Sequence, residues 1–131
     1  MSGELAARDI QCFLGWSRRN VYPPHPNIHT DHDFARERGF PGAIMSASQI
    51  VPHLHEAVID AVGCAVFFGG TRLRYKMVRP IGSESRAHVR VLRTDDPTTL
   101  ELRVENAEGD LCIVGEAVLP EGGAVAGVPS G

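Results

Sequence analysis

The feature that most limits the possible folds of this chain is a single helix-length apolar stripe followed only by strand-like segments. Between residues 43 and 62, apolar residues recur at spacings of three and four, which predicts one long amphipathic helix ending at Gly63. Pro52 lies inside this segment and predicts a kink or a later start. The stripe consists of Ala47, Ile50, Val51, Leu54, Val58, Ala61 and Val62.

Four segments with strand character follow this helix, and turn residues separate them. In residues 71–78, apolar side chains alternate with arginine and lysine, which predicts a half-buried strand with a basic outer face. The other three cover residues 84–93, 98–106 and 110–119. This order predicts an α+β domain in which an antiparallel sheet wraps around one long helix. One helix covers only part of such a sheet, so we expect a second protomer and hence a dimer.

Shorter elements are predicted outside this central unit. Residues 6–16 carry apolar positions at helical spacing and predict a first helix, and three prolines in residues 20–29 predict a loop. Residues 30–38 predict a short helix capped by Thr30 and ended by a glycine. Residues 120–131 are rich in glycine and proline, so we expect a folded domain at 1–119 and a flexible tail.

Composition narrows the class of protein. The chain has 131 residues, of which 43% are hydrophobic, as expected for one globular domain. A net charge of −3 gives no reason to expect nucleic acid or an anionic membrane as a partner. No apolar run is long enough to span a bilayer, and the start does not look like a signal peptide. The three widely spaced cysteines favour a reducing compartment. We therefore expect a soluble, cytoplasmic protein.

A motif in residues 28–44 is more specific than the fold class. Eight of its residues stand at the spacing of one enzyme family, namely Ile28, His29, Asp31, Ala35, Gly39, Phe40, Gly42 and Ile44. Through them, and over about residues 9–119, the chain resembles the MaoC-like (R)-specific enoyl-thioester hydratases and dehydratases, whose fold is the hot-dog fold. The resemblance implies a single hot-dog domain, an antiparallel sheet wrapped around one central helix, and a lyase activity.

The same resemblance implies a site and a reaction. The substrate would be an acyl or polyketide-like thioester on coenzyme A or an acyl carrier protein, with water added or removed at the β-carbon. His29 would move the proton, since an imidazole acts as either acid or base near neutral pH. The backbone near Ser46 and Ala47 would bind the thioester oxygen, because unpaired N–H groups at a helix N-terminus favour negative charge. Asn27 lies beside the motif and is expected to contact substrate. No cofactor is expected.

Two departures from the family pattern affect the chemistry. The family carries an aspartate five residues before the histidine, where this chain has Pro24. The histidine–glycine pair at the start of the family's long helix is Ser46–Ala47 here. His25 is the nearest residue that could replace the missing acid. Three possibilities stay open: His25 acts instead, a second hot-dog chain supplies the acid in a heterodimer, or the protein no longer hydrates anything. A non-catalytic subunit that completes a partner's site is the first alternative to an enzyme.

Other residue groups leave further alternatives. Glu56 lies on the long helix, where hot-dog thioesterases commonly carry a catalytic carboxylate, so hydrolysis of the thioester is a second candidate activity. Isomerisation or cyclisation in the same cleft is also open. His25, His29 and His32 do not follow a standard zinc spacing, so no metal is expected. The basic residues of 71–79 are expected either to hold coenzyme A phosphates or to protect a solvated sheet edge.

Overall fold

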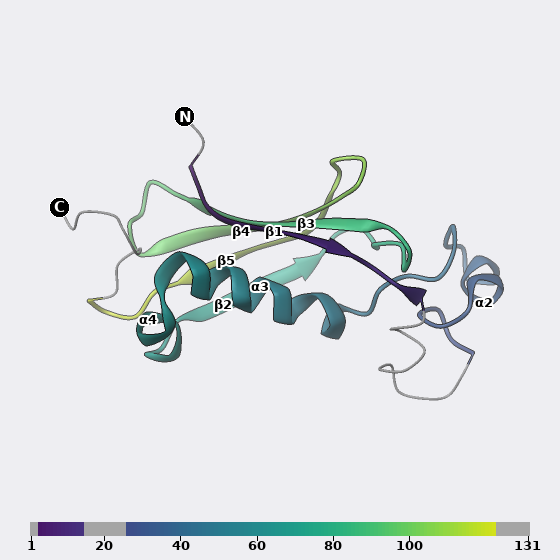
Figure 1. Ribbon diagram of the computed structural model, residues 1–131, viewed down its shortest axis with the longest axis horizontal. Helices are drawn as coiled ribbons and strands as arrows, with labels where there is room; N and C mark the ends of the chain where they lie inside the picture. Colours follow the sequence, from purple (N-terminus) through teal and green to yellow (C-terminus); the bar gives the residue numbers. More distant parts are fainter. Residues whose placement is uncertain (1–2, 15–25, 123–131) are drawn as a thin grey trace.

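A computed structural model describes residues 3–14 and 26–122, and these form one curved sheet, one long helix and two short helices (Figure 1). Within these residues, no helix is long and apolar enough to cross a membrane. In chain order the elements are β1 (Glu4–Gln11), α2 (His32–Glu37), α3 (Ala47–Val62), α4 (Cys64–Phe68), β2 (Arg72–Met77), β3 (Arg86–Arg93), β4 (Thr99–Asn106) and β5 (Leu111–Val118).

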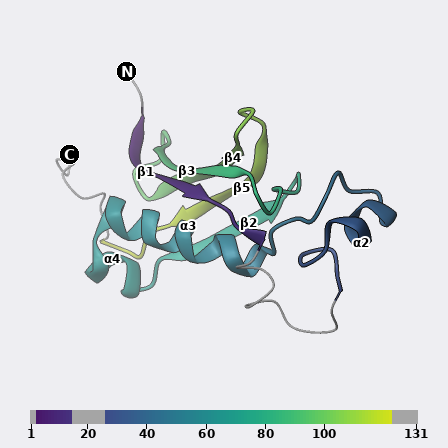
Figure 2. The same ribbon diagram turned by 45° about the vertical axis from the view of Figure 1, so that its right-hand side comes forward.

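The five strands pair in the order β1-β3-β4-β5-β2, and every neighbouring pair is antiparallel. The sheet curves around α3, which runs along its inner face, whereas α2 lies beyond the end of the sheet where α3 begins (Figures 1 and 2). The predicted α+β architecture, with an antiparallel sheet around one long helix, is confirmed.

The apolar face of α3 forms the centre of the core. Ile50, Leu54 and Val58 are fully buried, and they belong to one cluster with inward-facing residues of the sheet such as Leu102 and Ile113. Burying a large aliphatic side chain contributes roughly 1.5–3 kcal/mol relative to leaving it exposed. The stripe predicted from the sequence is therefore the face that attaches the helix to the sheet.

The predicted start of this helix at residue 43 was wrong, because α3 begins at Ala47 with Ser46 as its N-cap. Residues 43–45 are instead extended and pair with a distant segment, and Ile44 forms an isolated antiparallel bridge with Gly82. Pro52 lies in the second turn of the helix and is exposed to solvent. The helix ends as predicted at Gly63, whose φ of 87° is in the left-handed region that glycine adopts without strain.

The predicted first helix at residues 6–16 was also wrong in the part that the structure describes. Residues 4–11 form strand β1, which pairs antiparallel with β3 and brings Ile10 opposite Ala87. Ile10 is buried in the core, and Arg8, two residues earlier, is partly buried. The sheet therefore has five strands rather than four, because pairing with β3 overrides a weak helical spacing. The short helix α4 was not predicted.

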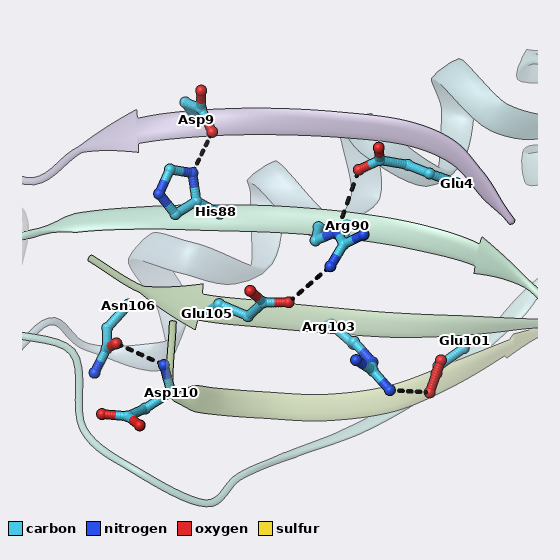
Figure 3. Close-up of polar contacts among 9 residues, drawn as sticks. All are labelled: Glu4, Asp9, His88, Arg90, Glu101, Arg103, Glu105, Asn106 and Asp110. Atoms are coloured by element: carbon cyan, nitrogen blue, oxygen red, sulfur yellow. Dashed lines mark hydrogen bonds and ion pairs between the residues drawn. The ribbon is translucent and has the colours of Figure 1, made fainter. Parts of the chain in front are cut away.

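The outer face of the sheet carries charges of both signs that pair across neighbouring strands (Figure 3). On β3, His88 bonds to Asp9 of β1, and Arg90 lies between Glu4 at 3.2 Å and Glu105 at 3.1 Å. Each exposed pair of this kind contributes at most about 1 kcal/mol. The main effect of these paired charges is to keep the outer face of the sheet hydrated.

Strand β2 is exposed on both faces, so the prediction of a half-buried strand was wrong. Only Leu73 is partly buried, and Tyr75 is 43% exposed. β2 is an edge strand that pairs with β5 alone. Large apolar side chains accumulate at this edge, and the exposed ones are Tyr75, Met77, Val78 and Leu111.

The attachment of β2 depends on Gly115. A Cβ atom at this position would lie 2.2 Å from the Arg74 carbonyl oxygen and 2.8 Å from the Tyr75 Cα atom. We expect Gly115→Ala to destabilise the protein by roughly 1–3 kcal/mol, because backbone atoms must move to admit the methyl group. Urea unfolding measures this. Glu116→Ala is the matched control, since it removes an exposed ion pair with Arg74, and such pairs contribute little to stability. Equal losses for the two variants would contradict the steric explanation.

Candidate active site

A hydrogen-bonded turn sets the backbone of the motif. The Asn27 side-chain oxygen accepts a hydrogen bond from the His29 N–H at 2.9 Å, and the Thr30 hydroxyl oxygen accepts one from the Asn27 N–H at 2.9 Å. The Asn27 carbonyl accepts from the N–H groups of Thr30 and Asp31 at 3.1 and 3.2 Å. Such asparagine turns occur where a side chain replaces a backbone acceptor. The structure therefore gives the Asn27 oxygen a positioning role, and its contact with substrate stays a prediction.

Asp31 caps the short helix α2. Its carboxylate accepts a hydrogen bond from the Phe34 N–H at 2.9 Å, and its backbone is extended, as expected of an N-cap residue. The prediction that Thr30 caps this helix was wrong, because the Thr30 hydroxyl is bonded to Asn27 instead. The prediction that Gly39 ends this helix is right to within one residue. The C-cap is Arg38, and Gly39 follows it with a φ of 94°.

The His29 imidazole lies just ahead of the long helix. Its Nδ1 atom is 2.8 Å from the Ile44 carbonyl oxygen, two residues before the α3 N-cap. A carbonyl only accepts, so Nδ1 carries the proton and Nε2 presents a lone pair. His29 is half-buried, and Nε2 has no hydrogen-bond partner among residues 3–14 and 26–122. The ring therefore has one nitrogen anchored and the other available to accept a proton.

Pairing with a distant segment fixes the carbonyl that anchors His29. The Ser83 N–H donates to the Ala43 carbonyl at 2.9 Å, and the Met45 N–H donates to the Ile81 carbonyl at 2.8 Å. The Ile44 N–H donates to the Ile28 carbonyl at 2.9 Å. Residues 43–45 are buried. Residues 43–45, just before α3, are thus hydrogen-bonded both to the start of the motif and to the loop before β3.

The first turn of α3 leaves one backbone donor free. The Ser46 N–H donates to the Gln49 side-chain oxygen at 3.2 Å, and the Ser48 N–H donates to the Ser46 hydroxyl at 3.3 Å. The Gln49 N–H donates to the Ser46 carbonyl at 3.0 Å. Within the described part of the chain, the Ala47 N–H has no partner, and Ala47 is exposed. Of the two residues expected to bind an oxyanion, Ser46 is therefore occupied by capping and Ala47 offers the free N–H group.

A signal for this arrangement is present in the sequence but did not enter the prediction. Serine followed three residues later by glutamine is a capping-box pattern, which marks the start of a helix. Ser46 and Gln49 form such a box here. The pattern places the first helical residue at Ala47, whereas hydrophobic spacing alone does not.

The residue expected to replace the missing acid cannot be placed. His25 and Pro24 both lie outside the described residues. Within the described residues, no group of three or more histidine, cysteine, aspartate or glutamate side chains is arranged to hold a metal ion.

Glu56 lines a groove of about 630 Å³ between β1 and α3, together with His53 and Phe13. Its carboxylate is bonded to the Arg8 guanidinium at 2.7 Å, and Arg8 also bonds Asp60 at 2.9 Å. Glu56 follows Ser46 by about 15 Å along the helix axis, at 1.5 Å per residue. This pairing supports a role for Glu56 in attaching β1 to α3, away from the His29 site.

The cysteines do not supply a nucleophile to this site. Burial raises the pKa of the Cys12 thiol to about 11, and burial also raises the pKa of Cys112. A thiol in such surroundings is almost fully protonated near neutral pH and therefore unreactive. Cys64 is exposed at the far end of α3.

The sequence matches no family model and no curated protein. Solved structures do match. A MaoC-like dehydratase from Phytophthora capsici has a TM-score of 0.70 and 13% identity, with 87% of this chain and 39% of that chain covered. The (R)-hydratase from A. caviae involved in PHA biosynthesis has a TM-score of 0.60 and 20% identity, with 91% and 95% covered. A chain of the ChsH1–ChsH2 complex from Mycobacterium tuberculosis has a TM-score of 0.62 and 12% identity, with 91% and 97% covered.

These identities are too low to carry an activity across, but the structural agreement extends over most of the chain. This chain spans only 39% of the length of the Phytophthora protein, whereas it spans nearly all of the other two. The five-stranded antiparallel sheet, the central helix and the similarity to these structures agree. This protein therefore has the hot-dog fold of the MaoC-like dehydratases and (R)-hydratases.

Proposed function

We propose that this chain acts in a hydratase or dehydratase that adds or removes water at the β-carbon of an acyl or polyketide-like thioester. The observation that carries the proposal is the 2.8 Å bond between His29 Nδ1 and the Ile44 carbonyl. It anchors a proton acceptor immediately ahead of the helix whose first residue, Ala47, has a free N–H group. A base and an oxyanion donor at one helix N-terminus are two of the three groups that this reaction needs, and the third is an acid for the α-carbon.

In the hydration direction, His29 Nε2 takes a proton from water while the water oxygen bonds to the β-carbon. The electron pair of the carbon–carbon double bond moves toward the thioester carbonyl, whose oxygen becomes negative. The Ala47 N–H group and the positive end of the α3 dipole stabilise that oxygen. An acid then protonates the α-carbon, which restores the carbonyl. Dehydration runs through the same steps in reverse.

The acid for the α-carbon is the open part of this mechanism. Asp31 is committed to capping α2. In one version His25 supplies the proton, so that two imidazoles share the acid–base work. In the other, a second hot-dog chain supplies a carboxylate and this chain supplies His29 and the oxyanion donor. The likeness to a chain of the ChsH1–ChsH2 complex makes the second version a reasonable proposal.

Strand β2 supports the proposal of a dimer. Its outer edge has no strand partner in the described residues, and its exposed apolar side chains adjoin that edge. An unpaired edge with apolar neighbours is a ready template for a strand of another chain. We propose a homodimer, or a heterodimer with a second hot-dog chain, in the cytoplasm. Arg72 and Lys76, on the same strand, are candidates for contacts with the phosphates of coenzyme A.

The test is an assay of the purified chain with crotonyl-coenzyme A, alone and after co-expression with a second hot-dog chain, with the solution mass measured on the same samples. If His25 is the acid, the chain alone hydrates the thioester. Its pH profile is then bell-shaped, because one imidazole acts as base and the other as acid, and His25→Ala flattens one limb. If the partner supplies the acid, the chain alone is inactive and His25→Ala has no effect on the complex.

Activity of the chain alone that survives loss of His25 would contradict both versions. Release of free coenzyme A instead of hydration would point to hydrolysis. Glu56→Gln then separates a thioesterase, which should lose activity, from an unrelated reaction. A monomer at micromolar concentration would contradict the dimer.

A further inference from the structure

His32, the first residue of α2, bridges two loops of the site. The Ala43 N–H donates a hydrogen bond to His32 Nδ1 at 3.0 Å. On the other side of the ring, Nε2 lies 3.4 Å from a carboxylate oxygen of Glu84, in the loop before β3. A ring nitrogen that accepts a hydrogen bond carries no proton. In this structure the His32 ring is therefore neutral, with its proton on Nε2 facing Glu84.

Gly42 makes this contact possible. A Cβ atom at residue 42 would lie 2.9 Å from His32 Nδ1, closer than Cβ atoms approach a neighbouring atom that is not bonded to them. The imidazole therefore packs directly on the backbone of Gly42 while it accepts from the next residue. The backbone N–H of Ala43 is buried together with its side chain, so its acceptor matters for the stability of this loop conformation.

We propose that neutral His32 is a positioning residue for His29, which rests on the function proposed above. His32 holds the Ala43 N–H, and the adjoining Ile44 carbonyl anchors His29 Nδ1 at 2.8 Å. The His32 ring thus fixes the peptide segment whose carbonyl determines which His29 nitrogen carries the proton and where the His29 ring points. His29 Nε2 accepts a proton only while the proton of its ring stays on Nδ1.

The contact depends on the charge of His32. A second proton would occupy Nδ1, and two donors would then face each other at the Ala43 N–H. The charged groups around the ring are Glu84 at Nε2, and Arg36, Arg79 and Glu108, which line the same groove of about 760 Å³. Arg36 is itself paired with Asp33.

Two isosteric variants separate the acceptor from the rest of the ring. In His32→Asn, the amide oxygen can take the place of Nδ1, which keeps an acceptor for Ala43 that does not titrate. In His32→Gln, the amide group reaches toward Glu84 but leaves no acceptor at the Nδ1 position. His88→Asn, on the outer face of the sheet, is the matched control for loss of an imidazole elsewhere.

Two readouts are measured on the folded full-length protein, in the assembly that is active. The first is the tautomer of His29, from the nitrogen and carbon chemical shifts of its ring. The second is kcat and KM for hydration of the thioester. We expect His32→Gln to lower kcat about 10- to 100-fold with KM changed only a few-fold, as small misplacements of catalytic groups do. It should also reduce the Nδ1–H tautomer of His29. His32→Asn should keep both the His29 tautomer and kcat near wild type.

Equal behaviour of the asparagine and glutamine variants, with the His29 tautomer unchanged in both, would overturn the proposal. If no variant hydrates a thioester, the proposed function fails, and the positioning role of His32 is then judged from the His29 tautomer alone. A shift in His32→Gln that is absent in His32→Asn then still supports the positioning role, and no shift in either refutes it.

Discussion

Replacing His29 with asparagine is expected to lower the rate of hydration at least ~100-fold, the lower end of what a positioned acid–base group contributes. The asparagine amide N–H can still donate to the Ile44 carbonyl, so the 2.8 Å contact that ties the motif to the loop before α3 has a substitute. No atom of asparagine can take the place of Nε2 in accepting a proton. The variant therefore removes the chemistry and keeps the local structure.

The measurement is kcat/KM for the thioester in the assembly that is active, together with the midpoint of thermal unfolding. His55→Ala is the control. His55 also carries an imidazole, but it lies in the second half of α3, where it packs against Phe67 of α4. It should leave the rate within a few-fold of wild type. Hydration by His29→Asn at the wild-type rate, with an unchanged unfolding midpoint, would remove His29 from the mechanism.

Replacing Ala47 with proline is expected to lower kcat roughly 100- to 1,000-fold, the effect of deleting one oxyanion-hole donor. Ala47 is the first residue of α3, and proline is well tolerated at this position because its backbone N–H has no partner within the helix. The preceding residue, Ser46, has φ of −73° and ψ of 144°, a conformation that residues before proline prefer. The substitution therefore deletes the free N–H group without disturbing the helix.

Ala47→Val is the matched control, since it adds bulk at the same exposed position and retains the N–H group. We expect this variant to keep activity within a few-fold of wild type, with circular dichroism showing the same helix content in both variants. If the proline variant is as active as the valine variant, the thioester oxygen is not bound by this amide. If both lose activity equally, the position is sensitive to bulk rather than to the donor.

The parts of this fold that could be predicted are those whose burial repeats along the chain. The stripe from Ala47 to Val62 has the period of a helix because one side packs on the sheet. Residues of β3 and β4 alternate because one face of each strand is buried. Residues 4–11 show the limit of this reasoning, because their spacing fits a helix weakly and pairing with β3, far along the chain, makes them a strand.

For the site, the sequence by itself determined the residue types: the motif that contains His29, the serine and alanine at the start of the helix, and the absence of the family's aspartate at Pro24. Only the tertiary structure decided how these residues are held. The bond from His29 to the Ile44 carbonyl, the free N–H of Ala47 and the packing of His32 on Gly42 all depend on backbone groups. Every residue except proline has the same backbone donor and acceptor, so these pairings leave no pattern in the order of side chains.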